Sequence, residues 1–407
     1  MNAKRGVERK AVSNWILFML AASCGLIVAN LYYAQPLVGP ISSATGLSPD
    51  AAGLIVTVTQ IGYVAGLLFI VPLSDIMENR LLAVVSLLVA DAALIAAAFA
   101  ANAPLFLAAA LFIGLGSVVA QILVPYATYL ASEEQRGRVV GNVMSGLLLG
   151  IMFARPLASF ITSLWGWRAV FVFSAVVTAV IIVLLAFVLP PRKPVPAMKY
   201  GRLIVSLGTL FKETSILRRR AAYQACLFGA FSLFWTAVPL HLADAFGLSQ
   251  QGIALVALAG VGGAVAAPIA GRLADKGWTR FLTGLALVVG AASLLLTYLF
   301  RGHSTVDLVL LIVSAIMLDM AVSGNLVLGQ RAIYSLGSEA RGRLNGLFMS
   351  IFFIGGAIGS LLGGWSYAYG GWMLTALIGA GLPILAFLYY LTEKRVEAKS
   401  LKTASCP

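Results

Sequence analysis

The chain has 407 residues, of which 60% are hydrophobic and only 11% are charged, whereas soluble domains carry about 25% charged residues. This composition excludes a soluble globular protein and indicates a protein that crosses a membrane several times. Although the net charge is +13, the basic residues lie in short clusters between apolar runs. That pattern is typical of membrane topology and does not indicate a nucleic-acid partner.

In chain order, the apolar runs form twelve segments, each about as long as the roughly 20 residues needed to cross a bilayer core. The first six cover residues 14–35, 50–73, 81–100, 104–127, 139–163 and 168–190. After a polar break come residues 221–243, 252–271, 281–300, 307–330, 344–368 and 372–392. We therefore predict an all-α polytopic membrane protein with twelve transmembrane helices in two six-helix halves.

The polar break, residues 191–220, is rich in basic residues, and its prolines argue against one continuous helix. We interpret it as a cytoplasmic linker between an N-terminal half, residues 1–190, and a C-terminal half, residues 221–407. With the N-terminus inside, 25 of the 28 Lys and Arg residues lie on the inner side, whereas only Arg168 and Arg301 lie outside. By the positive-inside rule, both termini are predicted to be cytoplasmic.

The two halves are related by an internal repeat at a distance of 205 residues. Glu134, Arg136, Gly137, Arg138, Gly141, Met144, Ser145, Gly150, Gly166 and Trp167 recur as Glu339, Arg341, Gly342, Arg343, Gly346, Met349, Ser350, Gly355, Gly371 and Trp372. Six helices repeated in the same orientation form a parallel repeat, with its axis along the membrane normal. Such a repeat predicts a binding site between the halves near the midplane.

On these residues the chain resembles the major facilitator superfamily over essentially its whole length, and most of all its bacterial drug:proton antiporter-like and sugar-efflux-like members. The family signature after the second helix is Gly-x-Leu-x-Asp-(Arg/Lys)-x-Gly-x-(Arg/Lys). The second half matches it at Gly271, Leu273, Asp275, Lys276 and Arg280, with Gly277 one position early, and the first half keeps only Leu73, Asp75 and Arg80.

The resemblance implies a cytoplasmic gate, in which Asp75 and Asp275 contact the repeated arginines. We expect these arginines to be Arg136 and Arg138 in the first half and Arg341 and Arg343 in the second. The alternative is a set of ordinary loop salt bridges, each contributing less than about 1 kcal/mol. Other departures from the family concern the fourth helix, which carries no arginine, and the fifth, where Arg155-Pro156 replaces Gly-Pro.

Charged residues within the spans are the strongest functional candidates, because they are costly to insert. Asp319 lies twelve residues from both Asp307 and Arg331, so it persists there only if it faces water, a partner or a bound cation. The alternative is a protonated carboxyl that hydrogen-bonds a neighbouring helix. Away from the span ends, Arg155 is the only Lys or Arg inside a span; it can bind anionic cargo, pair with an intramembrane acid or reach the outer surface. Asp91 is expected to pair with Arg155 or to join two helices.

The resemblance also implies which helices surround the central cavity, and these supply the candidate substrate contacts. Beside Arg155, the candidates are Asn30, Gln60, Gln121, Trp235 and Asn325, with Gln330 as a further polar residue. Each of these side chains can instead form a hydrogen bond that joins two helices. Tyr32, Tyr33, Trp165 and Trp167 are expected in the aromatic belt at the outer membrane surface.

We therefore predict a secondary active transporter of the bacterial inner membrane that exports small organic molecules. Its halves rock around the central site, and a proton binds Asp319. The alternative is a uniporter or importer of a small anionic metabolite, with Arg155 binding the anion. Spacings typical of enzymes or metal sites are missing from the sequence, so no enzymatic activity, metal or cofactor is expected. The expected partners are cargo, protons and membrane lipid, and the chain is expected to act as a monomer.

Overall fold

The computed structural model describes residues 14–131, 135–194, 199–299, 304–336 and 341–393. The side chains of Arg136 and Arg341 lie outside the described part. Glu134, Glu339 and Arg301 lie outside it entirely. Within the described ranges the chain is helical, with turns between helices and no strand. Ten of these helices are long and apolar enough to cross a membrane.

The first six spans are built from eight helices. They are α1 (Asn14–Ala29), α2 (Val38–Thr45), α3 (Leu54–Ala65), α4 (Asn79–Ala98), α5 (Ala103–Ser117), α6 (Val119–Leu130), α7 (Arg136–Trp165) and α8 (Trp167–Val188). The first span runs through α1 and α2, so it continues beyond the predicted end at residue 35. It ends at Thr45 because Gly46, with φ 73°, adopts the left-handed conformation that terminates helices.

The remaining spans follow a helix that the sequence analysis did not predict. This helix, α9 (Tyr200–Glu213), lies within the linker and buries Leu203 and Leu207 on one face. It is followed by α10 (Ser215–Asp244), α11 (Gln250–Ala257), α12 (Gly262–Asp275), α13 (Thr279–Leu299), α14 (Thr305–Tyr334) and α15 (Arg341–Leu391). Apolar residues three or four apart explain α9, because they give a short helix one buried face.

The helix α15 contains the last two spans. It breaks at Gly371, whose φ of 57° and ψ of −157° are not helical and are accessible to glycine at little cost. The helices thus provide twelve crossings: α1–α2, the segment around α3, α4, α5–α6, α7, α8, α10, α11–α12, α13, α14 and the two parts of α15. The predicted fold class is confirmed.

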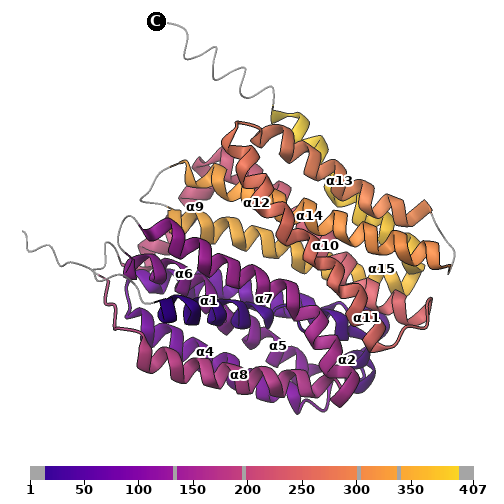
Figure 1. Cartoon of the computed structure of the whole chain (residues 1–407), viewed down its shortest axis with the longest axis horizontal. Helices are drawn as coiled ribbons and strands as arrows, with labels where there is room; N and C mark the ends of the chain where they lie inside the picture. The colour runs from indigo at the N-terminus through magenta and orange to yellow at the C-terminus, as the bar shows by residue number, and fades with distance from the viewer. Residues whose placement is uncertain (1–13, 132–134, 195–198, 300–303, 337–340, 394–407) are drawn as a thin grey trace, which may run out of the picture.

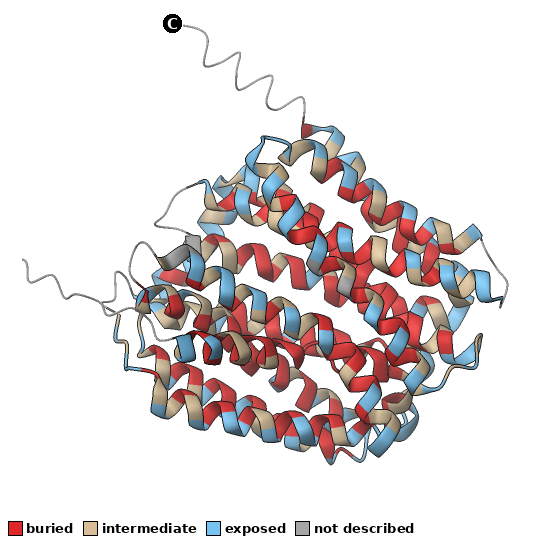
Figure 2. Cartoon of the chain, in the orientation of Figure 1, coloured by how far each residue is buried: buried red, intermediate tan, exposed pale blue. Residues whose placement is uncertain are grey.

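The helices form two bundles that lie side by side, with α1 to α8 in one and α10 to α15 in the other (Figure 1). Buried residues concentrate where helices face one another, and exposed residues cover the outside (Figure 2). Many of the exposed side chains are apolar, such as Phe18, Phe153 and Phe187. This arrangement suits a bundle surrounded by lipid instead of water.

Glycines bring the backbones of neighbouring helices into direct contact in both halves. A Cβ atom on Gly150 of α7 would lie 2.1 Å from the carbonyl oxygen of Gly25 on α1. A Cβ atom on Gly359 of α15 would lie 1.9 Å from the carbonyl oxygen of Gly229 on α10. No side chain fits at either position, so glycine sets the distance between the helices. The halves are therefore built alike at these contacts.

The halves also touch each other, most closely at the end of the bundle opposite to α9. There the Thr57 hydroxyl donates to the carbonyl of Ala357 at 3.1 Å and lies 2.8 Å from the Ser360 hydroxyl. A Cβ atom on Gly364 would lie 2.4 Å from the backbone nitrogen of Gly53. We call this the far end and the end that carries α9 the linker end. In this conformation the halves are closed together at the far end.

Candidate functional site

Two opposite charges meet between the halves. Arg155 of α7 and Asp319 of α14 are 1% and 4% exposed, and Nη2 of Arg155 lies 3.6 Å from Oδ1 of Asp319. The indole nitrogen of Trp235, on α10, donates a hydrogen bond of 3.0 Å to the other carboxylate oxygen. Each charge therefore has a partner from the opposite half, which is what makes a buried ion pair tolerable.

Aromatic rings surround the arginine. The carbon at the centre of its guanidinium group lies 4.0 Å from the centre of the Trp235 ring and 4.9 Å from that of Phe231, distances that favour cation–π attraction. Among the described residues, Nε and Nη1 of Arg155 have no hydrogen-bond partner. Gly260 leaves space beside them, because a Cβ atom there would lie 3.5 Å from Nη1. The arginine thus keeps two unused donors in a buried site.

The cavity beside this pair is small. It has a volume of about 60 Å³ and is lined from both halves, with Tyr32, Met152, Phe228 and Phe352 among its walls. A few water molecules fit into this volume, whereas sites for organic ligands usually occupy several hundred Å³. In this conformation the central cavity is therefore too small for an organic ligand.

The local sequence of α7 helps to place Arg155. Pro156 follows it within the helix and cannot donate the backbone hydrogen bond that would reach back one turn, so the helix is loosened beside the charge. Arg155 then points from α7 toward α10 and α14. Asp91, the other acid inside a span, is not its partner. Asp91 lies on α4, and within the described residues its buried oxygen Oδ1 accepts no hydrogen bond.

The predicted polar contacts occupy several different places. Trp235 contacts both charges, and Gln60 of α3 donates to Ser232 of α10 at 3.1 Å, across the halves. Asn30 accepts a hydrogen bond from Ser174 of α8. Asn325 donates to Gln224 of α10 at 2.7 Å. The last two contacts join helices within one half, and neither asparagine lines the central cavity as the described residues outline it.

Two further polar candidates lie nearer to the linker end. Gln121 donates to the hydroxyl of Tyr63 at 3.2 Å, and Gln330 donates to Asn345 at 3.2 Å. Gln121 and Asn345 line a cavity of about 440 Å³ between the halves. This cavity is separate from the small central one.

Most of the aromatic residues that we expected in the belt at the outer membrane surface are buried instead. Trp165 is exposed, whereas Trp167 is buried against Phe106 and Phe171. Tyr32 and Tyr33, in the turn between α1 and α2, are buried too. Tyr32 lines the central cavity, and its place two residues after the polar Asn30 was the signal that the belt interpretation overlooked.

The expected gate residues at the linker end differ from the prediction in their partners. Asp75, Arg192 and Arg343 line the cavity of about 440 Å³ together, so Asp75 lies near an arginine of the opposite half. Arg138 lines another cavity, between α1 and α7. The prediction that Asp75 reaches Arg138 is therefore wrong for this conformation.

The second-half aspartate also has a different partner. Asp275 forms an ion pair with Arg331, in the last turn of α14, and Arg331 donates to the carbonyl of Gly271 at 2.8 Å. Arg343, the expected partner, donates to Ser206 of α9 at 3.0 Å. The reason is the packing of α12 directly against α14, which puts Arg331 closer to the end of α12 than α15 is.

Two further signature arginines stabilise helix ends within one half. Arg80 lies 3.4 Å from Glu78 and donates to the carbonyls of Ala186 and Leu189, at the end of α8. Arg280 lies over the ring of Tyr390. Neither contact crosses the interface between the halves.

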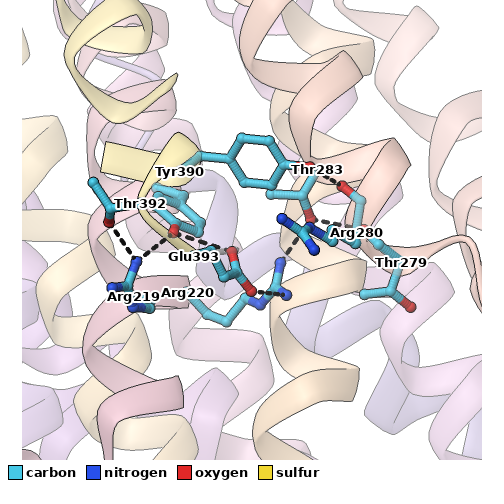
Figure 3. A network of polar contacts seen from close by, with 9 residues as sticks. Arg219, Arg220, Thr279, Arg280, Thr283, Tyr390, Thr392 and Glu393 are labelled. Carbon is cyan, nitrogen blue, oxygen red and sulfur yellow. Dashed lines mark hydrogen bonds and ion pairs between the residues drawn. The ribbon is translucent and has the colours of Figure 1, made fainter. Parts of the chain in front are cut away.

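A second buried ion pair lies at the linker end of the C-terminal half (Figure 3). Arg220 of α10 lies 3.0 Å from Glu393 and donates to Thr283 of α13 at 2.8 Å. Arg219 donates to Thr392 at 3.0 Å. The cluster ties α10 and α13 to the chain after α15. It was missed because Glu393 lies beyond the predicted spans, where charged residues are ordinary.

Twelve spans in two halves that enclose a buried ion pair define a polytopic membrane protein of the transporter type. The sequence profile described as Major Facilitator Superfamily matches residues 17–299 and 220–405. The chain belongs to this family.

Known proteins are similar to this chain over most of its length. The uncharacterised transporter YgaY of Escherichia coli O157:H7 is 41% identical over 379 residues, 92% of this chain and 94% of that one. The chloramphenicol efflux pump Rv0191 of Mycobacterium tuberculosis (strain ATCC 25618 / H37Rv) is 26% identical over 266 residues, 63% of each chain. Among solved structures, a bacterial homologue of the human lysosomal transporter Spinster matches with a TM-score of 0.73 and 14% identity, over 94% of this chain and 97% of that one.

Proposed function

We propose that this transporter exports small organic molecules across a bacterial inner membrane, coupled to protons by alternating access. The observation that carries the proposal is the ion pair between Arg155 and Asp319, buried between the halves. Intramembrane ionisable residues of this kind mark substrate or proton pathways. The similarity to a chloramphenicol efflux pump supports export.

The proton acts at Asp319. Protonation removes the negative charge that attracts Arg155 and that accepts the hydrogen bond of Trp235. The attraction between the halves then falls, because the contact between Arg155 and Asp319 crosses the interface and depends on that charge. The halves can separate around the site, which is how a transporter of parallel repeats exposes a central site to the two sides in turn. Residues 1–190 and 221–407 would be the two moving halves, connected by the linker 191–220.

The orientation in the membrane follows from the basic residues. Arg192, Arg343 and the basic residues of α9 lie at the linker end, which we place in the cytoplasm together with both termini. The cavity of about 440 Å³ opens at this end, whereas the far end is closed by Thr57 and Ser360. The conformation described here would thus face the cytoplasm, ready to take up cargo for export.

The test uses inside-out membrane vesicles with an acidified interior. A pH-sensitive dye reports proton release on addition of cationic, neutral or anionic compounds. We expect one class of compound to release protons with the wild type and none to do so with Asp319→Asn. Asp244→Asn is the matched control, because Asp244 is exposed at the far end, where it accepts a hydrogen bond from Tyr367. Proton release by Asp319→Asn at the wild-type rate would contradict the proposed coupling.

The unused donors of Arg155, Nε and Nη1, favour a second candidate, a uniporter or importer of a small anion. Charge balance separates the two. Arg155 and Asp319 together are neutral, so a bound anion leaves a net negative charge in a buried site unless a proton binds at the same time. A bound cation instead gives the same net charge as a protonated Asp319, so cation and proton can exchange.

The measurement that distinguishes them is the direction of proton movement. Cationic cargo should move against protons, and anionic cargo should move with them or without them. Arg155→Ala should abolish binding of anions while sparing neutral compounds if the second candidate is right. Equal loss of all compounds would favour an exporter in which Arg155 only holds Asp319.

A further inference from the structure

A long groove between α1 and α7 is separate from the central site. It has a volume of about 680 Å³ and opens on the outside of the N-terminal half. Phe18, Leu149 and Phe153 on its walls are exposed, so the groove faces the surrounding bilayer. Its floor is the close contact of the two helices at Gly25, Gly146 and Gly150.

The polarity of the groove changes along its length. At the linker end it is lined by Asn14 of α1 and by Arg138 and Asn142 of α7. From Gly146 to Leu157 its α7 wall is apolar. With a rise of 1.5 Å per residue, this apolar stretch is about 16 Å long. That length equals the hydrocarbon part of one leaflet, which is about 15 Å thick.

The polar end carries a charge that no described residue neutralises. Arg138 is exposed, and within the described residues it forms no hydrogen bond or ion pair. Its counterpart in the repeat behaves differently, because Arg343 donates to Ser206 and shares a cavity with Asp75. Both copies of the repeat therefore contain the arginine, but among the described residues only Arg343 forms a hydrogen bond with another side chain of the protein. The side-chain amides of Asn14 and Asn142 add hydrogen-bond donors beside Arg138.

We propose that this groove binds an anionic membrane phospholipid from the leaflet at the linker end. One acyl chain lies along Leu149, Phe153 and Leu157, and the phosphate accepts hydrogen bonds from Arg138 and Asn142. A phospholipid matches both the apolar stretch and the polar end of the groove. Its acyl chain is as long as the apolar stretch, and its phosphate lies at the level of Arg138. The bound chain also packs against α7 on both sides of Arg155, so the lipid supports the helix that carries the central cation.

The test measures lipid binding to the purified full-length protein by native mass spectrometry. The probes are phosphatidylglycerol and phosphatidylcholine with the same acyl chains. We expect the wild type to prefer phosphatidylglycerol about fivefold, the usual effect of one basic residue near an anionic lipid surface. Arg138→Gln should lose this preference. Arg272→Gln should keep it, because Arg272 is equally exposed at the end of α12 but lies outside the groove.

A second variant tests the apolar part. Ala22 is half-buried on the α1 wall, and Ala22→Phe should fill the groove and reduce binding of both lipids, with gel filtration confirming a folded protein. Two outcomes would overturn the proposal. One is equal binding of the two lipids by the wild type, which would mean that only acyl chains are recognised. The other is an equal effect of Arg138→Gln and Arg272→Gln, which would assign the preference to net charge.

Discussion

Trp235 connects the two buried charges at the centre of the molecule. Its N–H donates to Asp319 at 3.0 Å, and its ring lies 4.0 Å from the guanidinium carbon of Arg155. The direct contact between the charges is 3.6 Å, longer than a good hydrogen bond. The indole N–H therefore gives Asp319 a hydrogen bond that Arg155 does not provide. It leaves two donors of Arg155 free for a ligand or water.

Because both charges are buried, stability and transport should respond differently to their removal. Arg155→Met or Asp319→Leu alone leaves an unpaired buried charge, which typically costs about 3–5 kcal/mol. The double variant removes both charges and should recover most of that loss, while transport stays abolished. Thermal unfolding in detergent measures the first effect and vesicle flux the second. If the double variant unfolded as early as the worse single one, the two charges would not act as a pair.

At the scale of elements, α7 has three roles. It contacts α1 through glycines, carries Arg155 toward the other half and forms one wall of the outer groove. The first role depends on the absence of a side chain at Gly150. Elsewhere on α7 a glycine has no such role, since a Cβ atom on Gly141 would meet nothing within 4 Å.

This difference predicts opposite effects for the same substitution. Gly150→Ala puts a Cβ atom 2.1 Å from the Gly25 carbonyl oxygen, so the helices must separate, and we expect a loss of about 1–3 kcal/mol. Gly141→Ala should be neutral or stabilise by up to about 1 kcal/mol, since alanine is the better helix former. The midpoint of thermal unfolding in detergent compares the two. A similar decrease for both would mean that α1 and α7 are not held by this contact.

The sequence predicted the elements better than their partners. Length and hydropathy locate the spans. The repeat of Gly150 as Gly355 indicates where helices approach, since a Cβ atom on Gly355 of α15 would lie 2.2 Å from the carbonyl oxygen of Ala225 on α10. Helix α9 was not predicted, since the prolines before it suggested an irregular linker and its two buried leucines form a weak pattern. The gate partners that the structure describes differ from the predicted ones for a different reason. The partner of Asp275 depends on which helix packs against α12, and sequence distance does not contain that information.

At the scale of the whole molecule, the halves share a scaffold and differ in chemistry. The glycine contacts recur, whereas Arg155 corresponds to Ser360 and Asp319 to Gly114. Both charged residues could be found from sequence, because each interrupts an apolar span. Their pairing could not, since Asp91 was an equal candidate from depth alone. Ser360 instead belongs to the contact that closes the far end, where it meets Thr57.

Alternating access requires that this far-end contact opens during each cycle. The hydroxyl oxygens of Thr57 and Ser360 lie 2.8 Å apart, so Thr57→Cys/Ser360→Cys should form a disulfide between the halves on oxidation. We expect oxidation to stop flux in vesicles and a reductant to restore it, because the covalent bond holds the far end closed. The matched control is Ser366→Cys/Thr375→Cys, whose hydroxyls lie 3.0 Å apart within the C-terminal half. That disulfide joins no moving parts and should leave flux unchanged. Full flux through a protein with a complete disulfide between residues 57 and 360 would show that the far end need not open, and rocking of the two halves would then be the wrong mechanism.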